Sequence, residues 1–117
     1  MIVYAKIVNL TEDYIENNID EKILIDDLAD YVSISRFHFH RIFKEYTGES
    51  IHQFISRVKI ERSAMFMLVR KDLTITEIAY RYGYSESSSY TRAFKRHFKM
   101  SPRTFKTARN VKTYNMV

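Results

Sequence analysis

Residues 75–106, ITEIAYRYGYSESSSYTRAFKRHFKMSPRTFK, decide the fold, because an earlier stretch of the chain has the same pattern. The earlier stretch is IDDLADYVSISRFHFHRIFKEYTGESIHQFI, residues 25–55. Its first residues align with the later copy at a separation of fifty positions, and the rest align at fifty-one. The second copy therefore holds one extra residue near Gly83. A repeat that tolerates an insertion in a turn is typical of a duplicated supersecondary unit.

Each copy is predicted to form a helix, a tight turn and a second helix. In the first copy, Asp26 is expected to cap a short helix that runs through Val32. Ser35 is expected to cap the second helix, which reaches about Tyr46. Gly48 then provides a left-handed stop.

The short helix of the second copy has two candidate caps. Thr74 with Glu77 would form a capping box, but the alignment of the two copies favours Thr76. Gly83 is expected in the turn, and Ser85 is expected to open the next helix.

The end of that next helix is expected to be less sharp than the end of its counterpart. Lys99 stands where the first copy has Gly48, and lysine adopts the left-handed conformation less readily.

Helices are also predicted outside the repeated parts. Apolar residues at one-face spacing predict a first helix over about residues 3–18; they are Val3, Ile7, Leu10 and Tyr14. A long helix is predicted from Ile51 to about Leu68, roughly 27 Å at 1.5 Å per residue. Its first apolar row comprises Ile51, Phe54, Ile55, Val58 and Met65, and its second comprises Ile60, Ala64 and Met67. Two rows indicate a connector that packs against both copies.

Composition agrees with an all-α chain of 117 residues. Two glycines and one proline are too few for many tight turns, and the absence of cysteine excludes disulfides and thiolate sites. The sequence also lacks a long uncharged apolar run and a signal peptide, so no membrane partner is expected and a cytoplasmic location is predicted. The predicted organisation is a first helix-turn-helix subdomain at 1–50, a connecting helix at 51–69, a second subdomain at 70–109, and a tail or start of a linker at 110–117.

Charge is distributed unevenly along the chain. Residues 1–30 hold two Lys/Arg and eight Asp/Glu, whereas residues 31–117 hold 17 Lys/Arg and six Asp/Glu. A basic surplus of this size favours a polyanionic partner such as nucleic acid, although many soluble domains are basic.

The second helix of each copy has a core side and an outer side. Its core positions are Phe39, Ile42, Phe43 and Tyr46 in the first copy, and Tyr90, Ala93, Phe94 and His97 in the second. Its outer positions are Arg36, Phe37, His40, Arg41 and Lys44 in the first copy, and Ser87, Ser88, Thr91, Arg92 and Lys95 in the second. Arginine can bond guanine O6 and N7, and hydroxyls can donate or accept, so these faces suit a major groove.

Individual outer residues have simpler interpretations too. Phe37 can contact a thymine methyl group, or it can pack against a neighbouring helix. Arg41 and Arg92 can read guanine or can be ordinary solvated cations. The candidate phosphate contacts are Ser33, Ser35, Lys44, Thr76, Ser85, Lys95 and Arg96. For the serines and the threonine, helix capping alone would explain their positions.

No metal site, cofactor or catalytic group is predicted. His38 and His40 are two positions apart on a helix, so their side chains point away from each other. No carboxylate–histidine cluster has the spacing of metal ligands, so His52 and His97 also have no expected metal partners. His97 is expected at the core or its boundary. The sequence shows no phosphate-cradling glycine loop and no nucleophile–base pair.

Residues 3–109 resemble the AraC/XylS-type family of bacterial transcription regulators. The resemblance lies in the two quoted stretches, above all in I-A-x-x-x-G-Y, S-Y-x-R-x-F-K and S-P-x-x-F of the second, and in an altered R-x-x-x-A-x-x-x-L near residues 62–69. It implies seven helices in two homeodomain-like three-helix units, with recognition helices at about 35–46 and 86–98 that enter successive major grooves. The residues it implies as base contacts are Arg36, Phe37, His40, Arg41, Ser87, Ser88, Ser89 and Arg92.

The chain departs from the family pattern at a few positions. Lys99 replaces the usual glycine, and the short Ser87 and Ser88 make the second unit the weaker expected reader. The outer-face pattern leaves Ser89 at the edge.

The function expected from this resemblance is sequence-specific binding of double-stranded DNA by a transcription regulator, with activation through RNA polymerase. Since same-facing grooves lie about 34 Å apart, one chain could bind a non-palindromic site of about two turns. A small-molecule effector would act only through a companion domain absent from this chain. The alternative is a helical protein-interaction module whose basic face binds acidic partners.

Overall fold

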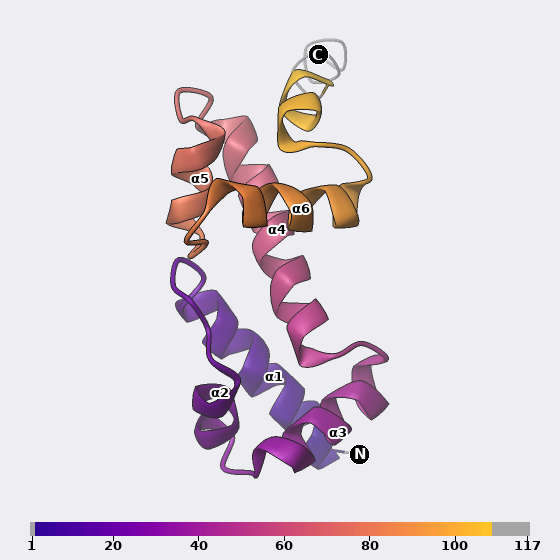
Figure 1. The fold of residues 1–117 in the computed structure, drawn as a ribbon. Coiled ribbons are helices and arrows are strands. Elements are labelled where there is room, and N and C mark those ends of the chain that lie inside the picture. Colours follow the sequence, from indigo (N-terminus) through magenta and orange to yellow (C-terminus); the bar gives the residue numbers. More distant parts are fainter. Residues whose placement is uncertain (1, 109–117) are drawn as a thin grey trace. The chain divides into compact units, whose positions relative to one another are not determined.

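The computed structural model describes residues 2–108, with side chains from residue 3, so the predicted tail at 110–117 lies outside the described part. Its helices are α1 (Ile2–Asn17), α2 (Ile25–Tyr31), α3 (Arg36–Thr47), α4 (Ile51–Val69), α5 (Ile75–Arg81) and α6 (Ser87–Phe98) (Figure 1). A further helical segment covers 102–108. Every regular element between residues 2 and 108 is helical, which confirms the all-α prediction with seven helices.

The chain divides into two compact units, Met1–Val58 and Lys59–Val117, and the boundary falls inside α4. The first, unit 1, comprises α1, α2, α3 and the start of α4. The second, unit 2, comprises the rest of α4, α5, α6 and the segment 102–108. No helix in the part of the chain that the structure describes is both long enough and apolar enough to cross a bilayer.

Unit 1 has its core where α3 meets α1, α2 and the start of α4. Phe39 and Phe43 of α3 are fully buried, and the ring of Phe43 lies 4.9 Å from that of Phe54, edge to face. Ile15, Leu28, Ile42 and Ile51 complete the group of fully buried large apolar side chains. Two residues predicted on buried faces are exposed, because each lies at a helix end: Val3 in the first turn of α1 and Tyr46, 43% exposed, in the last turn of α3.

Unit 2 has an aromatic core that contains two buried polar links. Tyr90 and Phe94 of α6 are fully buried, and Phe94 lies 5.4 Å from Phe105. The Ser63 hydroxyl lies 2.7 Å from the Tyr90 hydroxyl and donates to the Ile60 carbonyl at 2.8 Å.

The second buried polar link of unit 2 joins α4 to the turn after α5. Lys59 is only 5% exposed, and its Nζ donates to the Tyr82 carbonyl at 2.9 Å. These bonds satisfy groups that would be costly to bury unpaired.

The two predicted apolar rows of α4 are buried in different units. Ile51 and Phe54 are buried in unit 1, and Ile60, Ala64 and Met67 are buried in unit 2. Met65, predicted in the first row, is 64% exposed. It lies beyond the boundary at residue 58, on the side of α4 away from the row that unit 2 buries, so the first row ends before it.

The helix-turn-helix turns of the two units have matching backbone conformations. Ser33 and Gly83 are both left-handed, with φ of 62° and 84°. The next N–H donates to an alanine carbonyl in each unit, Ile34 to Ala29 at 3.1 Å and Tyr84 to Ala79 at 3.0 Å. The N-cap residues that follow are Ser35 and Glu86, so the extra residue of the second copy is Ser85.

Three of the predicted caps are wrong. The N-cap of α2 is Leu24, without a side-chain cap bond, because the helix begins before Asp26 and Asp26 lies in its first turn. Thr74, and not Thr76, caps α5 through a full capping box with Glu77. Ser85 does not open α6, whose N-cap is Glu86.

The ends of α3 and α6 are equivalent. Gly48 and Lys99 both adopt the left-handed conformation, with φ of 82° and 62°. Their N–H groups donate to the carbonyls of Lys44 at 2.9 Å and Lys95 at 2.8 Å. The prediction that α6 ends less sharply is therefore wrong, because this stop is made by a backbone hydrogen bond that lysine can also donate. The predictions for Ser35 and Gly48 are confirmed.

Candidate nucleic-acid interface

The outer face of α3 presents an aromatic ring and several cations to solvent. Arg36, Arg41 and Lys44 are exposed, and His40 is partly buried. Phe37 is 78% exposed, so it does not pack against a neighbouring helix within its unit. Exposure of an apolar ring to water is unfavourable, and contact with a thymine methyl group in the major groove would remove that exposure.

The arginines of α3 have only weak partners. Arg36 lies 3.4 Å from Asp26, and Arg41 lies 3.7 Å from Glu45, with all four side chains more than half exposed. Exposed pairs of this kind contribute about 0–1 kcal/mol, so both guanidinium groups can exchange these carboxylates for another acceptor at low cost.

The outer face of α6 is smaller and more polar. Ser88, Arg92 and Lys95 are exposed, whereas Ser87, Ser89 and Thr91 are partly buried. The Arg92 Nη2 atom donates to the Ser89 Oγ atom at 3.4 Å, and the Ser88 Oγ atom donates to the Glu86 Oε2 atom at 3.3 Å. Ser89 therefore lies beside the arginine at the edge of the face.

The candidate phosphate contacts are all exposed: Ser33, Ser35, Lys44, Thr76, Ser85, Lys95 and Arg96. Ser35 accepts the cap bond from the His38 N–H at 3.2 Å, so capping explains its position. Capping does not explain Thr76 or Ser85, because other residues occupy those N-cap positions.

His52 is a neighbour of the α3 face that the sequence did not single out. Its ring centroid lies 5.8 Å from that of His40, although the two residues belong to different helices. Partial burial lowers the pKa of His40, and the positive charges of His52 and Arg36 lower it further. No sequence signal brings His52 to this face, because only the packing of α4 against α3 places it there.

The remaining histidines have other surroundings. His38 is exposed on α3. His97, predicted at the core or its boundary, is instead an exposed residue; its side chain is 31% exposed, and its Nε2 atom lies 3.1 Å from Glu61 Oε2. Among the described residues, no three His, Cys, Asp or Glu side chains are grouped as metal ligands would be.

The two units differ in charge. Unit 1 has six Lys/Arg against ten Asp/Glu, a net charge of −4, and unit 2 has thirteen against four, a net charge of +9. The basic surplus therefore belongs to the unit that carries α6.

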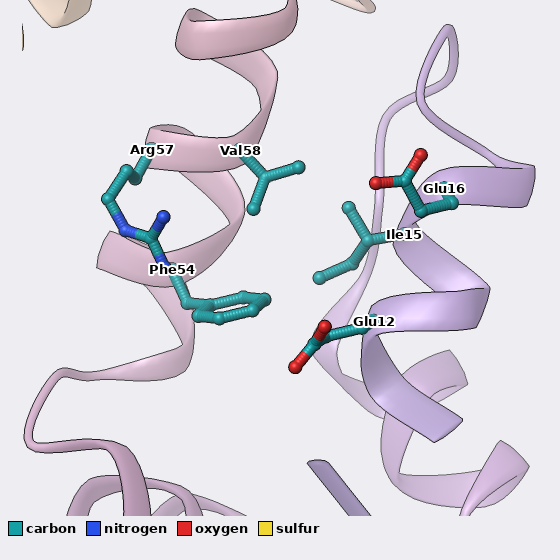
Figure 2. Close-up of a pocket in the computed structure, with 6 residues that line it drawn as sticks. All are labelled: Glu12, Ile15, Glu16, Phe54, Arg57 and Val58. Carbon is teal, nitrogen blue, oxygen red and sulfur yellow. The ribbon is translucent and has the colours of Figure 1, made fainter. Parts of the chain in front are cut away.

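A cavity of about 190 Å³ lies in unit 1 between α1 and α4 (Figure 2), and none of its lining residues belongs to α3. Glu12, Ile15 and Glu16 line one side, and Phe54, Arg57 and Val58 line the other. The guanidinium group of Arg57 is held by Glu49 at 2.8 Å and lies 4.9 Å from the centre of the Phe54 ring.

Comparison with known proteins decides the family. Residues 28–108 match the protein family described as a helix-turn-helix domain. The chain also resembles the crystal structure of a transcriptional regulator from Chromobacterium violaceum, described as an AraC-type DNA-binding-domain protein. The TM-score is 0.81 at 26% identity, over 90% of this chain and 93% of that one. This chain belongs to the AraC/XylS-type family of helix-turn-helix transcription regulators. The family predicted from the sequence is thereby confirmed.

Curated relatives of this AraC-type chain are longer than it is. The transposon Tn10 TetD protein of Escherichia coli is 35% identical over 89 residues, which are 76% of this chain and 64% of TetD. The transcriptional activator RhaS of Escherichia coli is 30% identical over 106 residues, which are 91% of this chain and 38% of RhaS. The alignment with RhaS therefore leaves most of that regulator unmatched.

Proposed function

We propose that this chain is the DNA-reading part of a bacterial transcription regulator and that α3 and α6 enter successive major grooves of double-stranded DNA. The observation that carries the proposal is the equivalence of two exposed helix faces. Arg41 and Arg92 occupy the same repeat position, as do Lys44 and Lys95. Each face ends at a left-handed stop and follows a left-handed turn.

In this proposal the base contacts are Arg36, Phe37, His40, Arg41, Ser87, Ser88, Ser89 and Arg92. The phosphate contacts are Ser33, Ser35, Lys44, Thr76, Ser85, Lys95 and Arg96. The two readers are the subdomains 1–50 and 70–109, joined by the helix 51–69. Support comes from the exposure of every one of these side chains except His40, Ser87 and Ser89, which are partly exposed.

We also propose that the regulator activates transcription through RNA polymerase in the cytoplasm. The support is the relative RhaS, which is named a transcriptional activator. A small-molecule effector would act on a companion domain, in keeping with the greater length of RhaS. The proposed regulator acts by binding DNA, and no enzymatic step is proposed.

The test is selection of bound duplexes from a random DNA pool at about 150 mM salt, a concentration that screens distant charge attraction. The Arg41→Ala/Arg92→Ala double variant is selected in parallel, and a Lys6→Ala/Lys22→Ala variant, altered outside α3 and α6, is the charge-matched control. The proposal expects an asymmetric motif with two blocks about one helical turn apart, recovered by the parent and the control but lost in the double variant. Weak binding without enrichment, equal in all three proteins, would refute it and favour a protein-interaction module.

A further inference from the structure

The rings of His40 and His52 form a pair at the border of the α3 face. Their centroids are 5.8 Å apart, with an interplanar angle of 36°. His40 is partly buried beside Phe39, whereas His52 is exposed in the first turn of α4. The pair therefore extends the candidate interface from α3 onto a second helix.

The surroundings of the pair are cationic. On α3, Arg36 precedes His40 by one turn and Lys44 follows it by one turn. Asp26 of α2 lies 3.4 Å from Arg36. The nearest carboxylates along the chain are engaged elsewhere, Glu45 by Arg41 and Glu49 by Arg57. In the described part of the chain, neither imidazole has a carboxylate as an ion-pair partner.

We propose that His40, instead of reading a base edge, joins His52 in a proton-binding contact for a DNA phosphate, so that unit 1 takes up a proton when it binds DNA. This inference rests on the proposed function. In the free protein, a protonated His40 ring is repelled by His52 and by Arg36. A phosphate placed against both rings supplies the missing negative charge and favours the protonated form.

The sign of the pH dependence follows from this linkage. In the free chain, burial and the neighbouring positive charges hold the pKa of His40 below its ordinary value of 6.5. A phosphate raises that pKa in the complex. Affinity is then highest below the free pKa and is lost as pH rises through the pKa of the complex. Uptake of one proton changes the affinity by at most about tenfold per pH unit within that window.

The experiment measures affinity of the full chain for the duplex obtained by the selection, from about pH 5.5 to 8, an interval that brackets the imidazole pKa. The variants are His40→Gln and His52→Gln. The matched control is His38→Gln, which removes an exposed imidazole of α3 that is not part of the pair. Calorimetry in two buffers of different ionisation enthalpy counts the protons taken up, and NMR follows the titration of His40 in the free protein.

The proposal expects that the pH slope and the proton uptake persist in the parent and in His38→Gln and disappear in both other variants. It also expects His52→Gln to raise the pKa of His40 in the free protein, which a purely structural role of His52 would not do. Retained motif binding with no proton uptake, or with equal uptake in His52→Gln, overturns this inference and leaves the proposed function intact. A pool without any enriched motif overturns both.

Discussion

Replacement of Lys99 by glycine should stabilise unit 2. Lys99 has a φ of 62° at the end of α6, where its N–H donates to the Lys95 carbonyl. A residue with a Cβ atom loses about 1–2 kcal/mol in this conformation. Glycine loses about 0.4–1 kcal/mol more than other residues through the entropy of the unfolded chain. The difference predicts a gain of about 0.5–1 kcal/mol for Lys99→Gly.

The equivalent position in unit 1 provides the reverse experiment. Gly48 has a φ of 82°, and a Cβ atom built there meets no atom within 4 Å. Gly48→Ala should therefore cost about 1 kcal/mol through backbone conformation alone, without a steric contribution. Lys99→Ala is the matched control, because it removes the charge and keeps the Cβ atom. Its effect should be limited to a few tenths of a kcal/mol from the loss of a cation at the helix end.

The measurement is urea denaturation, together with hydrogen exchange of the Phe43 and Phe94 amides, which report on unit 1 and unit 2 separately. Lys99→Gly should slow exchange at Phe94, and Gly48→Ala should speed exchange at Phe43. If Lys99→Gly and Lys99→Ala had equal effects, the change would come from charge. If Gly48→Ala were neutral as well, the reasoning from the left-handed conformation would be refuted.

Three further predictions concern the cores, the caps and pH. Because Ser63 donates to the Ile60 carbonyl, it must accept from Tyr90, so Tyr90→Phe should cost about 1 kcal/mol and Ser63→Ala about 1–3 kcal/mol. In a double-mutant cycle by urea denaturation the combined loss should be smaller than the sum, and strict additivity would mean that the bond is not formed. Thr74→Ala should destabilise unit 2 by about 1 kcal/mol, whereas Thr76→Ala should change it by less than about 0.5 kcal/mol, and the opposite order would contradict the capping box. Because the pKa of His40 is lowered in the folded chain, the unfolded chain binds more protons, so unit 1 should lose stability as pH falls below about 6.5 and level off below the folded pKa. Denaturation between about pH 5 and 8 tests this, with His40→Gln as the variant that should lack the effect.

Local chemistry explains which caps could be predicted from the sequence. Ser35 and Gly48 follow the ordinary preferences of helix ends, and both are confirmed. Ser33 and Lys99 have the same left-handed geometry as their glycine counterparts, but neither residue type signals it, since the hydrogen bonds of the surrounding turn impose it. The alignment of the two copies, which predicted the fold, also led to the wrong N-cap for α5. Leu24, the counterpart of Thr74, has no capping group, so the alignment transferred the wrong position to the second unit.

Features that depend on packing between helices could not be read from spacing alone. The spacing on α4 groups Met65 with Phe54, yet only the boundary at residue 58 explains why one is exposed and the other buried. The outer faces of α3 and α6 follow from helical periodicity, so the sequence named most of the candidate residues, and their contacts with DNA stay a prediction. His52 was not, because its neighbour His40 lies on another helix.

Phe37 and Ser88 occupy equivalent positions of the repeat but differ in size and polarity, so the two proposed reading faces are not interchangeable. If the two readers carried the same side chains, neither would prefer one half of the site over the other. In the proposed function, reversal would place a large apolar ring where a small hydroxyl belongs. Since one well-matched base contact is worth about 1–3 kcal/mol, the favoured direction would outnumber the reversed one by roughly ten to a hundredfold per contact. Under the proposed function, anything attached to such a reader would lie consistently on one flank of the bound site, upstream or downstream.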